Sequence, residues 1–259
     1  LLINLGGGMV TDLGGFVASV YKRGLAFINV PTSLLAMVDA AVGGKTGIDF
    51  AGYKNQIGTF RAAQATYIDT GFLHTLPSQE WANGFAELLK HALINDAQLW
   101  QNLSKIQDIQ NELRAETIQQ GVQIKVDIVA QDPTENGLRK ILNFGHSIGH
   151  ALESYYLNTA TPLSHGHAVA LGLLLESKLS VEQATLNKEE FLSIETRIKS
   201  SYALQIPKDA EGLWALMQQD KKNDHGEVRV CLLPEIGSCL FDQKLAFEDF
   251  EKVISGYCS

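Results

Sequence analysis

Strands and helices alternate along this sequence up to residue 76, and beyond Pro77 almost only helices follow. This order limits the fold more than any other feature of the chain. The early strands are short apolar runs at residues 1–5, 25–30 and 65–69. Such alternation is typical of a parallel, doubly wound sheet. The sequence therefore predicts a Rossmann-like α/β domain over residues 1–76 and a mostly α-helical domain over residues 77–259.

The helical part is expected to contain a series of helices and one late hairpin. Helices are predicted at residues 9–21 in the α/β part and, after it, at 78–95, 97–105, 109–131, 141–157, 165–186, 188–203 and 247–257. The strands 227–233 and 238–241 flank Pro234-Glu235-Ile236-Gly237, a sequence typical of a turn.

The first residues already read as a buried strand, Leu1-Leu2-Ile3-Asn4-Leu5, and no Met precedes them. We therefore expect a further segment ahead of Leu1. In a nucleotide-binding fold such a segment would supply the first strands and the acidic residue that holds the adenosine ribose.

Two glycine-rich turns in the α/β part are suited to anions. Gly6-Gly7-Gly8 joins a strand to a helix, which brings backbone N–H groups and a helix N-terminus to a phosphate, although the spacing is not G-x-G-x-x-G. The second turn, Gly43-Gly44-Lys45, combines a glycine backbone with the ammonium group of a lysine, and Lys54 and Asn55 follow it in the sequence. It is not a Walker A loop, because Asp39 stands where that motif has a glycine. A plain tight turn and a solvent loop with surface lysines are the alternatives.

Two histidines one helical turn apart, His146 and His150, lie among small and apolar residues. They share one face of a helix, and buried imidazoles need a polar partner or a metal ion. Glu87, within an apolar helix, and His165, ahead of another, could complete a His₂Glu set that leaves positions open for substrate. The alternatives are hydrogen-bonded core histidines or surface ones, and a salt bridge from Glu87 to Lys90 or His91 on its own helix.

Composition excludes some classes of function. The net charge of −8 gives no electrostatic footprint for nucleic acid. No apolar run reaches transmembrane length and no signal peptide is visible, so we expect no membrane role and a cytoplasmic protein. The cysteines Cys231, Cys239 and Cys258 lack metal-site spacing and are expected to be reduced thiols.

Six segments of the chain together carry a family resemblance. They are GGGMVTDLGGFVASVYKRG, PTSLLAMVDAAVGGKTGIDF, KNQIGTF, GFAELLKHALI, ENGLRKILNFGHSIGHALE and SHGHAVALG, in this order. Over nearly the whole chain they resemble 3-dehydroquinate synthase, of the sugar-phosphate cyclases. The resemblance implies an NAD- and metal-dependent lyase of the shikimate pathway. It would convert 3-deoxy-D-arabino-heptulosonate 7-phosphate to 3-dehydroquinate and phosphate by transient oxidation, elimination, reduction and aldol cyclisation.

The resemblance also assigns site residues by position. Glu87, His146 and His165 match the ligands of Zn²⁺ or Co²⁺. The family's residues near NAD⁺ are matched by Gly7, Gly8, Asp12, Thr75 and Lys54. Lys54 also matches a position near the family's substrate. Residues around the substrate are matched by Asp39, Lys45, Asn55, Lys90, Lys125, Glu135, Arg139, Asn143 and His150. Of these, His150 would transfer a proton or contact phosphate.

Further matches concern partners and departures from the family. Arg23 matches an arginine that reaches the substrate of the neighbouring subunit, which implies a homodimer. Lys221 or Lys222 would complete the cationic cluster. His167 stands where the family often has Glu, so the surroundings of His165 are expected to differ.

Three other functions remain open from the sequence. A sister cyclase, such as a deoxy-inosose or valiolone synthase, shares the turn, the metal set and most of the chemistry. A metal-dependent polyol dehydrogenase would oxidise its substrate without needing so many cations. An inactive binding module would need neither zinc nor NAD⁺.

Overall fold

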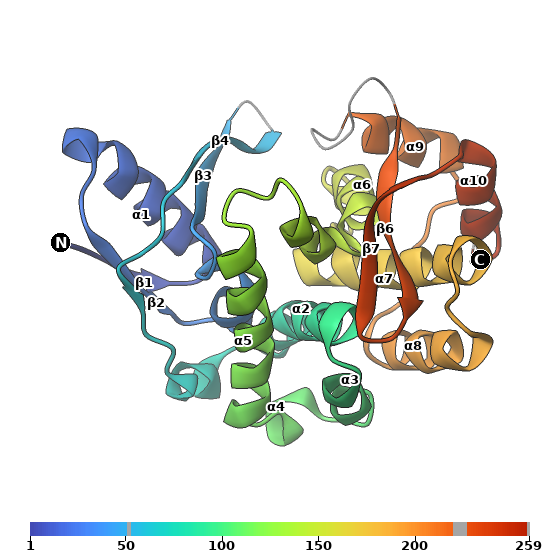
Figure 1. The fold of residues 1–259 in the computed structure, drawn as a ribbon, viewed down its shortest axis with the longest axis horizontal. Coiled ribbons are helices and arrows are strands. Elements are labelled where there is room, and N and C mark those ends of the chain that lie inside the picture. Colours follow the sequence, from blue (N-terminus) through green and yellow to red (C-terminus); the bar gives the residue numbers. More distant parts are fainter. Residues whose placement is uncertain (51–52, 220–226, 258–259) are drawn as a thin grey trace. The chain divides into compact units, whose positions relative to one another are not determined.

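The computed structural model describes residues 1–50, 53–219 and 227–257, and the chain divides into two compact units. Unit 1 comprises residues 1–88 and 108–139, and unit 2 comprises residues 89–107 and 140–259. Figure 1 shows their helices and strands. The division expected at residues 76 and 77 rests on a different criterion, the change from alternating strands to helices, and stays a prediction.

A parallel sheet lies at the start of unit 1. It joins β1 (Leu2–Gly6), β2 (Phe27–Pro31) and β5 (Ala65–Thr66) in this order. Helix α1 (Gly8–Val20) packs on β1 and β2. A Cβ on residue 14 of this helix would lie 1.9 Å from Asn4 Oδ1, so this close packing requires a glycine. The predicted α/β arrangement is confirmed.

Buried polar side chains tie the sheet to the segment that follows it. Asn4 Nδ2 donates to Asn29 Oδ1 at 2.9 Å. Asn29 Nδ2 then donates to the carbonyl oxygen of Ala41 at 3.2 Å, and Thr66 Oγ1 donates to the same oxygen at 3.3 Å. Ala41 ends the short π-helix η2 (Ala36–Ala40). These bonds fix the position of the chain just before the glycine–lysine turn.

A β-hairpin follows where the sequence suggested only a loop. Strands β3 (Lys45–Phe50) and β4 (Tyr53–Phe60) pair antiparallel. The hydroxyl oxygens of Thr46 and Thr59 lie 2.8 Å apart across them. Helix α1 packs against β3, where a Cβ on Gly15 would lie 2.5 Å from Thr46 Cγ2. The glycine–lysine turn thus leads directly into a strand, and the sequence predicted no strands between residues 45 and 60.

In the rest of unit 1 the structure has two short helices that the sequence did not predict, η1 (Tyr21–Arg23) and η3 (Thr70–Thr75), and a break in one predicted helix. The other helices of this part are α4 (Ile109–Glu112) and α5 (Ala115–Gln131), and α2 (Ser78–Asn95) begins in this unit. The single helix predicted over 109–131 is interrupted at Leu113, whose backbone is extended and whose side chain is buried. Two successive residues with extended backbone, Leu113 and Arg114, end α4 and precede α5.

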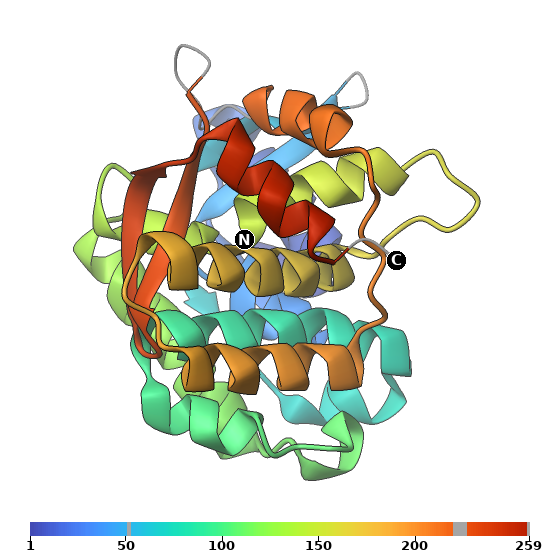
Figure 2. The ribbon, with the colours of Figure 1, turned by 90° about the vertical axis from the view of Figure 1, so that its right-hand side faces the viewer.

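Unit 2 is built around one buried helix. Its elements are α3 (Ala97–Leu103), α6 (His146–Tyr156), α7 (His165–Gln183), α8 (Lys188–Ser201), α9 (Ala210–Gln218), β6 (Arg229–Glu235), β7 (Ser238–Lys244) and α10 (Phe247–Ser255), with η4 (Leu138–Asn143) leading in. Helix α7 packs against α6, α8, α10 and β6, and it runs along α8 in both views (Figures 1 and 2). Its leucines Leu171, Leu175 and Leu179 are fully buried in the core.

Two helices of unit 2 differ from the prediction. The helix expected over 141–157 is split, because Gly145 has a left-handed backbone (φ 78°) that ends η4 and starts α6. Helix α9 was not predicted, and its first turn is capped by Asp209, which accepts a hydrogen bond from Gly212 N at 2.8 Å. The hairpin β6–β7 is confirmed. Among the described helices, none has the length and hydropathy of a membrane span.

Candidate active site

The glycine turn between β1 and α1 is tightly packed. A Cβ on Gly8 would lie 3.1 Å from Ala40 Cβ, and one on Gly7 would lie 3.4 Å from Ser33 Oγ. Helix α1 begins after Gly7 with no side-chain cap, so the backbone N–H groups of its first turn are not occupied by a capping side chain. This is the geometry that a helix N-terminus offers to a phosphate.

Asp12, one turn into α1, lies in an unusual electrostatic environment. Burial, the largest cause, and the nearby charges of Asp39 and Asp49 together raise the pKa of its carboxyl to about 7, although Lys125 acts to lower it. The folded protein therefore holds this proton over a pH range in which the unfolded chain releases it. The stability contributed by the protonated form is complete below about pH 4 and is lost as pH rises toward 7.

Replacing Asp12 with Asn should remove this pH dependence. The unfolding free energy of D12N minus that of the wild type is expected to be about 2 kcal/mol more favourable to D12N at pH 8 than at pH 4. This figure includes a reduction for solvent screening. Urea unfolding of both proteins at the two pH values measures this. Parallel pH profiles for the two proteins would contradict it.

Two ion pairs of unit 1 bring predicted substrate residues together. Lys125 Nζ, nearly buried on α5, lies 2.6 Å from Asp39 Oδ1 and donates to the carbonyl oxygen of Asp39 at 2.6 Å. Lys45, at the start of β3, is paired with Glu135. Residues far apart in the sequence thus meet, because α5 packs against η2. Carboxylates hold both ammonium groups in place.

Arg139 is the third predicted cation of unit 1, and it is only 2% exposed. Its Nη1 donates to the carbonyl oxygen of Pro133 at 2.6 Å, and its guanidinium lies 5.9 Å from the centre of the Phe60 ring. A Cβ on Gly43 would lie 2.8 Å from Arg139 Nη2, so the glycine–lysine turn passes directly over this side chain. Burial lowers the Arg139 pKa, while Glu135 and neighbouring carboxylates oppose that shift.

The other predicted residues of unit 1 lie elsewhere on it. Arg23 is exposed at the end of η1, with a left-handed backbone (φ 67°). Thr75 is exposed at the end of η3. Lys54 and Asn55 belong to β4, and their side chains are outside the described part of the chain. Glu87, on α2, is fully buried.

Three imidazoles cluster in unit 2. The ring centres of His146 and His150, one turn apart on α6, are 5.3 Å apart. His165, at the start of α7, lies 5.7 Å from His146 and 6.1 Å from His150. The contact between α6 and α7 brings these rings together. Imidazoles at this spacing offer nitrogen ligands to one divalent ion.

Oxygen atoms of other residues lie beside two of these rings. His146 Nδ1 lies 3.2 Å from the carbonyl oxygen of Phe144, so a proton on Nδ1 leaves Nε2 as the ligand atom. His165 Nδ1 lies 3.6 Å from a carboxylate oxygen of Glu153 on α6. A carbonyl or carboxylate behind an imidazole is the usual support of a metal-binding histidine.

The remaining predicted residues of unit 2 have varied surroundings. Lys90 on α2 is 1% exposed, and Asn143, at the end of η4, is half-buried. Lys221 and Lys222 lie outside the described residues. His167 points toward the end of α8, since its Nε2 lies 2.6 Å from the carbonyl oxygen of Ala203.

Comparison with known proteins decides the family. The family model described as 3-dehydroquinate synthase N-terminal matches residues 1–83, and the model described as 3-dehydroquinate synthase C-terminal matches residues 84–223. The chain belongs to the 3-dehydroquinate synthase family. A 3-dehydroquinate synthase from Parabacteroides distasonis is 41% identical over 261 residues, which cover 99% of this chain and 74% of the relative. The chain is thus an enzyme of this family, an NAD- and metal-dependent lyase.

Two solved structures are similar to the chain over 98% of its length. A 2-epi-5-epi-valiolone synthase from Streptomyces hygroscopicus subsp. jinggangensis, with NAD⁺ and Zn²⁺ bound, has a TM-score of 0.89, is 28% identical and is covered over 72% of its chain. A 2-deoxy-scyllo-inosose synthase complexed with carbaglucose-6-phosphate, NAD⁺ and Co²⁺ has a TM-score of 0.85, is 23% identical and is covered over 73%. At that identity the second likeness shows the fold alone.

Sequence reasoning missed two carboxylates around the imidazoles. Glu153 approaches His165, and Glu176 accepts a hydrogen bond from Gly145 N at 2.8 Å at the start of α6. Glu176 is fully buried in α7. A carboxylate inside the run Leu173-Leu174-Leu175-Glu176 is a signal that could have been noticed, because a buried charge needs polar partners.

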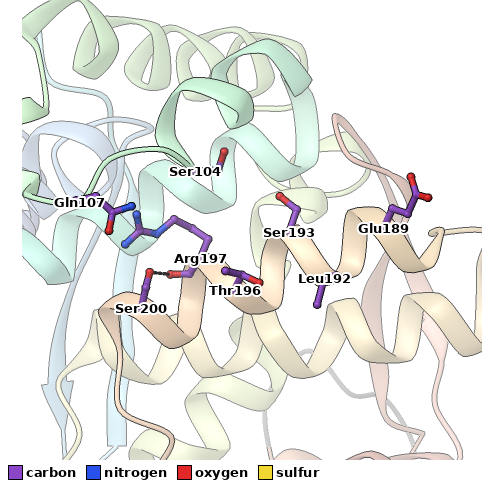
Figure 3. A pocket seen from close by; sticks show the side chains of 8 residues that line it. All are labelled: Ser104, Gln107, Glu189, Leu192, Ser193, Thr196, Arg197 and Ser200. Carbon is purple, nitrogen blue, oxygen red and sulfur yellow. Dashed lines mark hydrogen bonds between the residues drawn. The ribbon is translucent and has the colours of Figure 1, made fainter.

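A surface cavity of unit 2 takes no part in this site. It has a volume of about 490 Å³ and lies between the chain after α3 and one side of α8 (Figure 3). Ser104, Gln107 and Arg197 line it, together with hydroxyl-bearing residues of α8. No residue predicted for the active site is among those lining it.

Proposed function

We propose that the chain converts 3-deoxy-D-arabino-heptulosonate 7-phosphate to 3-dehydroquinate and phosphate. The observation that carries this is the grouping in unit 1 of Lys125, Lys45 and Arg139, each beside a carboxylate or a backbone carbonyl. A chain of net charge −8 holds these cations together, which suits a substrate with a carboxylate and a phosphate. Family membership supports the same reaction.

The residues present fit a divalent metal ion. Glu87, His146 and His165 are proposed as a His₂Glu ligand set, because Zn²⁺ or Co²⁺ suits these ligand types. Phe144 O fixes the tautomer of His146, and the buried carboxylate of Glu87 carries a cost that a bound cation offsets. The similar valiolone synthase holds Zn²⁺, which supports the same type of ion here.

The start of α1 fits a dinucleotide. Gly7 and Gly8 have no side chains, so the backbone of this helix start could approach a pyrophosphate closely. Asp12 lies one turn further on, where its carboxylate could accept a hydrogen bond from a ribose hydroxyl. Thr75 and Lys54 are proposed to contact the same cofactor. When bound, NAD⁺ accepts and returns a hydride and the metal ion acts as a Lewis acid on the substrate hydroxyl.

The chain's own residues then bind the substrate and move protons. Lys125 and Arg139 are proposed to hold its charged groups, since Asp39 and Pro133 already orient them. His150, on the same face of α6 as His146, would take or give a proton near the phosphate that leaves. The other proposed substrate contacts are Asp39, Lys45, Asn55, Lys90, Glu135 and Asn143, with Lys221 or Lys222 completing the cationic cluster.

A homodimer is proposed on the placement of Arg23. Its side chain is exposed at the end of η1, where it could reach the substrate of a second copy. If so, mixing inactive R23A and H146A proteins should restore part of the activity, because one mixed site receives both native residues. Sedimentation of the protein reports the dimer itself. Mixed proteins that stay inactive although they exchange subunits would contradict the role of Arg23.

A sister cyclase is the second candidate, because the valiolone synthase is similar over nearly the whole chain. The test supplies the protein with Zn²⁺, catalytic NAD⁺ and the heptulosonate phosphate, and follows phosphate release and NADH absorbance together. Stoichiometric phosphate, no lasting NADH and 3-dehydroquinate as product support the proposal. Phosphate released from a carboxylate-free sugar phosphate instead would favour a sister cyclase. Accumulating NADH without phosphate would mean a dehydrogenase.

A further inference from the structure

Helix α6, which carries His146 and His150, lacks a capping side chain of its own. Its N-cap is Gly145, whose backbone is left-handed and which has no side chain to accept a hydrogen bond. The first N–H groups of a helix have no partner within the helix. In a buried helix, another part of the chain has to supply the acceptors.

Glu176 of α7 supplies them. Its Oε2 accepts a hydrogen bond from Gly145 N at 2.8 Å, and its Oε1 accepts a longer one from Ile148 N at 3.4 Å. The residue is fully buried, so these bonds are shielded from water. A carboxylate at a helix N-terminus is also favoured by the helix dipole. Glu176 thus caps a helix 28 residues before it in the sequence.

The packing around this cap leaves α6 little freedom. A Cβ on Gly172 would lie 1.8 Å from the carbonyl oxygen of Gly145, so α6 starts in direct contact with the backbone of α7. Glu176 bonds on both sides of His146, at Gly145 and at Ile148. Helix α7 is held in turn by Ser180, whose hydroxyl donates to the carbonyl oxygen of Glu176 and accepts from Leu233 N of β6.

We propose that Glu176 is a positioning residue for the metal site, whose carboxylate fixes the first turn of α6 and with it the direction of the His146 imidazole. The inference rests on the proposed metal role of His146. Outer groups that orient a ligand commonly change metal affinity 10- to 100-fold. Glu176 would act in the same way, through the backbone on either side of the ligand.

The test compares E176Q with S180A as a matched control. In E176Q the side-chain amide places a donor where one of the two N–H groups needs an acceptor. We expect Zn²⁺ affinity, measured by competition with a chelator, to fall about tenfold, and the absorption spectrum of the Co²⁺-loaded protein to change. S180A removes two buried hydrogen bonds one turn further along α7, but it keeps the Glu176 carboxylate and its bonds to Gly145 N and Ile148 N. It should therefore lower stability but leave metal affinity and spectrum unchanged.

A readout that needs no metal separates this inference from the metal proposal. The ring resonances of His146 in the metal-free protein should shift in E176Q and not in S180A. Should E176Q fail to fold, E176D, whose shorter side chain cannot reach both N–H groups, replaces it. A folded variant with native affinity and an unchanged His146 ring would overturn the positioning role. A wild type that binds no Zn²⁺, with a shifted ring in the variant, would overturn the metal proposal alone.

Discussion

Replacing His146 with Ala should reduce kcat/KM at least about 1,000-fold and remove tightly bound zinc. The imidazole is one of the three proposed metal ligands, and loss of a Lewis acid costs several kcal/mol of transition-state stabilisation. His146 is nearly buried and clusters with His150 and His165, so no outside group can easily take its place. Metal content of the purified variant and the rate of phosphate release measure the two effects.

The matched control for this change is His74→Ala. His74 is exposed on η3 and is not among the proposed ligands. Its replacement should leave both zinc content and rate unchanged. Circular dichroism has to show that H146A is folded. A folded H146A that keeps stoichiometric zinc and near-native activity would exclude the proposed ligand set.

The sequence was sufficient for the elements whose apolar pattern is strong. The strands β1 and β2 and the helix α2 follow directly from short apolar runs and from a helical pattern that begins after Pro77. The hairpin β3–β4 could not be predicted, because Lys45-Thr46-Gly47 has neither alternation nor enough apolar residues. Strand β3 also packs through Thr46 on α1, a tertiary contact that no local pattern reveals.

The same distinction holds for the candidate site. The spacing of His146 and His150 places both on one face of a helix, and their rings do lie together. The approach of His165 depends instead on how closely α6 and α7 pack. That packing requires Gly172 of α7, which contacts the backbone of Gly145 and Gly149, far away in the sequence. Glu176 was missed for this reason: the run of leucines marks it as buried, but nothing near it indicates that it caps α6.

Replacing Gly172 with Ala should therefore have the largest effect on stability. The new Cβ would lie 1.8 Å from Gly145 O and 2.9 Å from Gly149 N, and both are backbone atoms that cannot rotate away. Helices α6 and α7 would have to separate, which breaks the cap made by Glu176. We expect a loss of at least about 3 kcal/mol in the free energy of unfolding, measured in urea, and weaker zinc binding in whatever folds.

Gly256→Ala is the control that separates overpacking from the mere addition of a methyl group. Gly256 also lies in unit 2, its backbone is helical (φ −70°, ψ −15°), and the nearest atom to a new Cβ is Val253 O at 3.4 Å. An alanine there fits without strain and should stabilise the protein by up to about 1 kcal/mol, because it restricts the unfolded chain. If G172A and G256A had the same stability, the close contact of α6 with α7 would not be required. The position of His146 would then have to be fixed by something other than that contact.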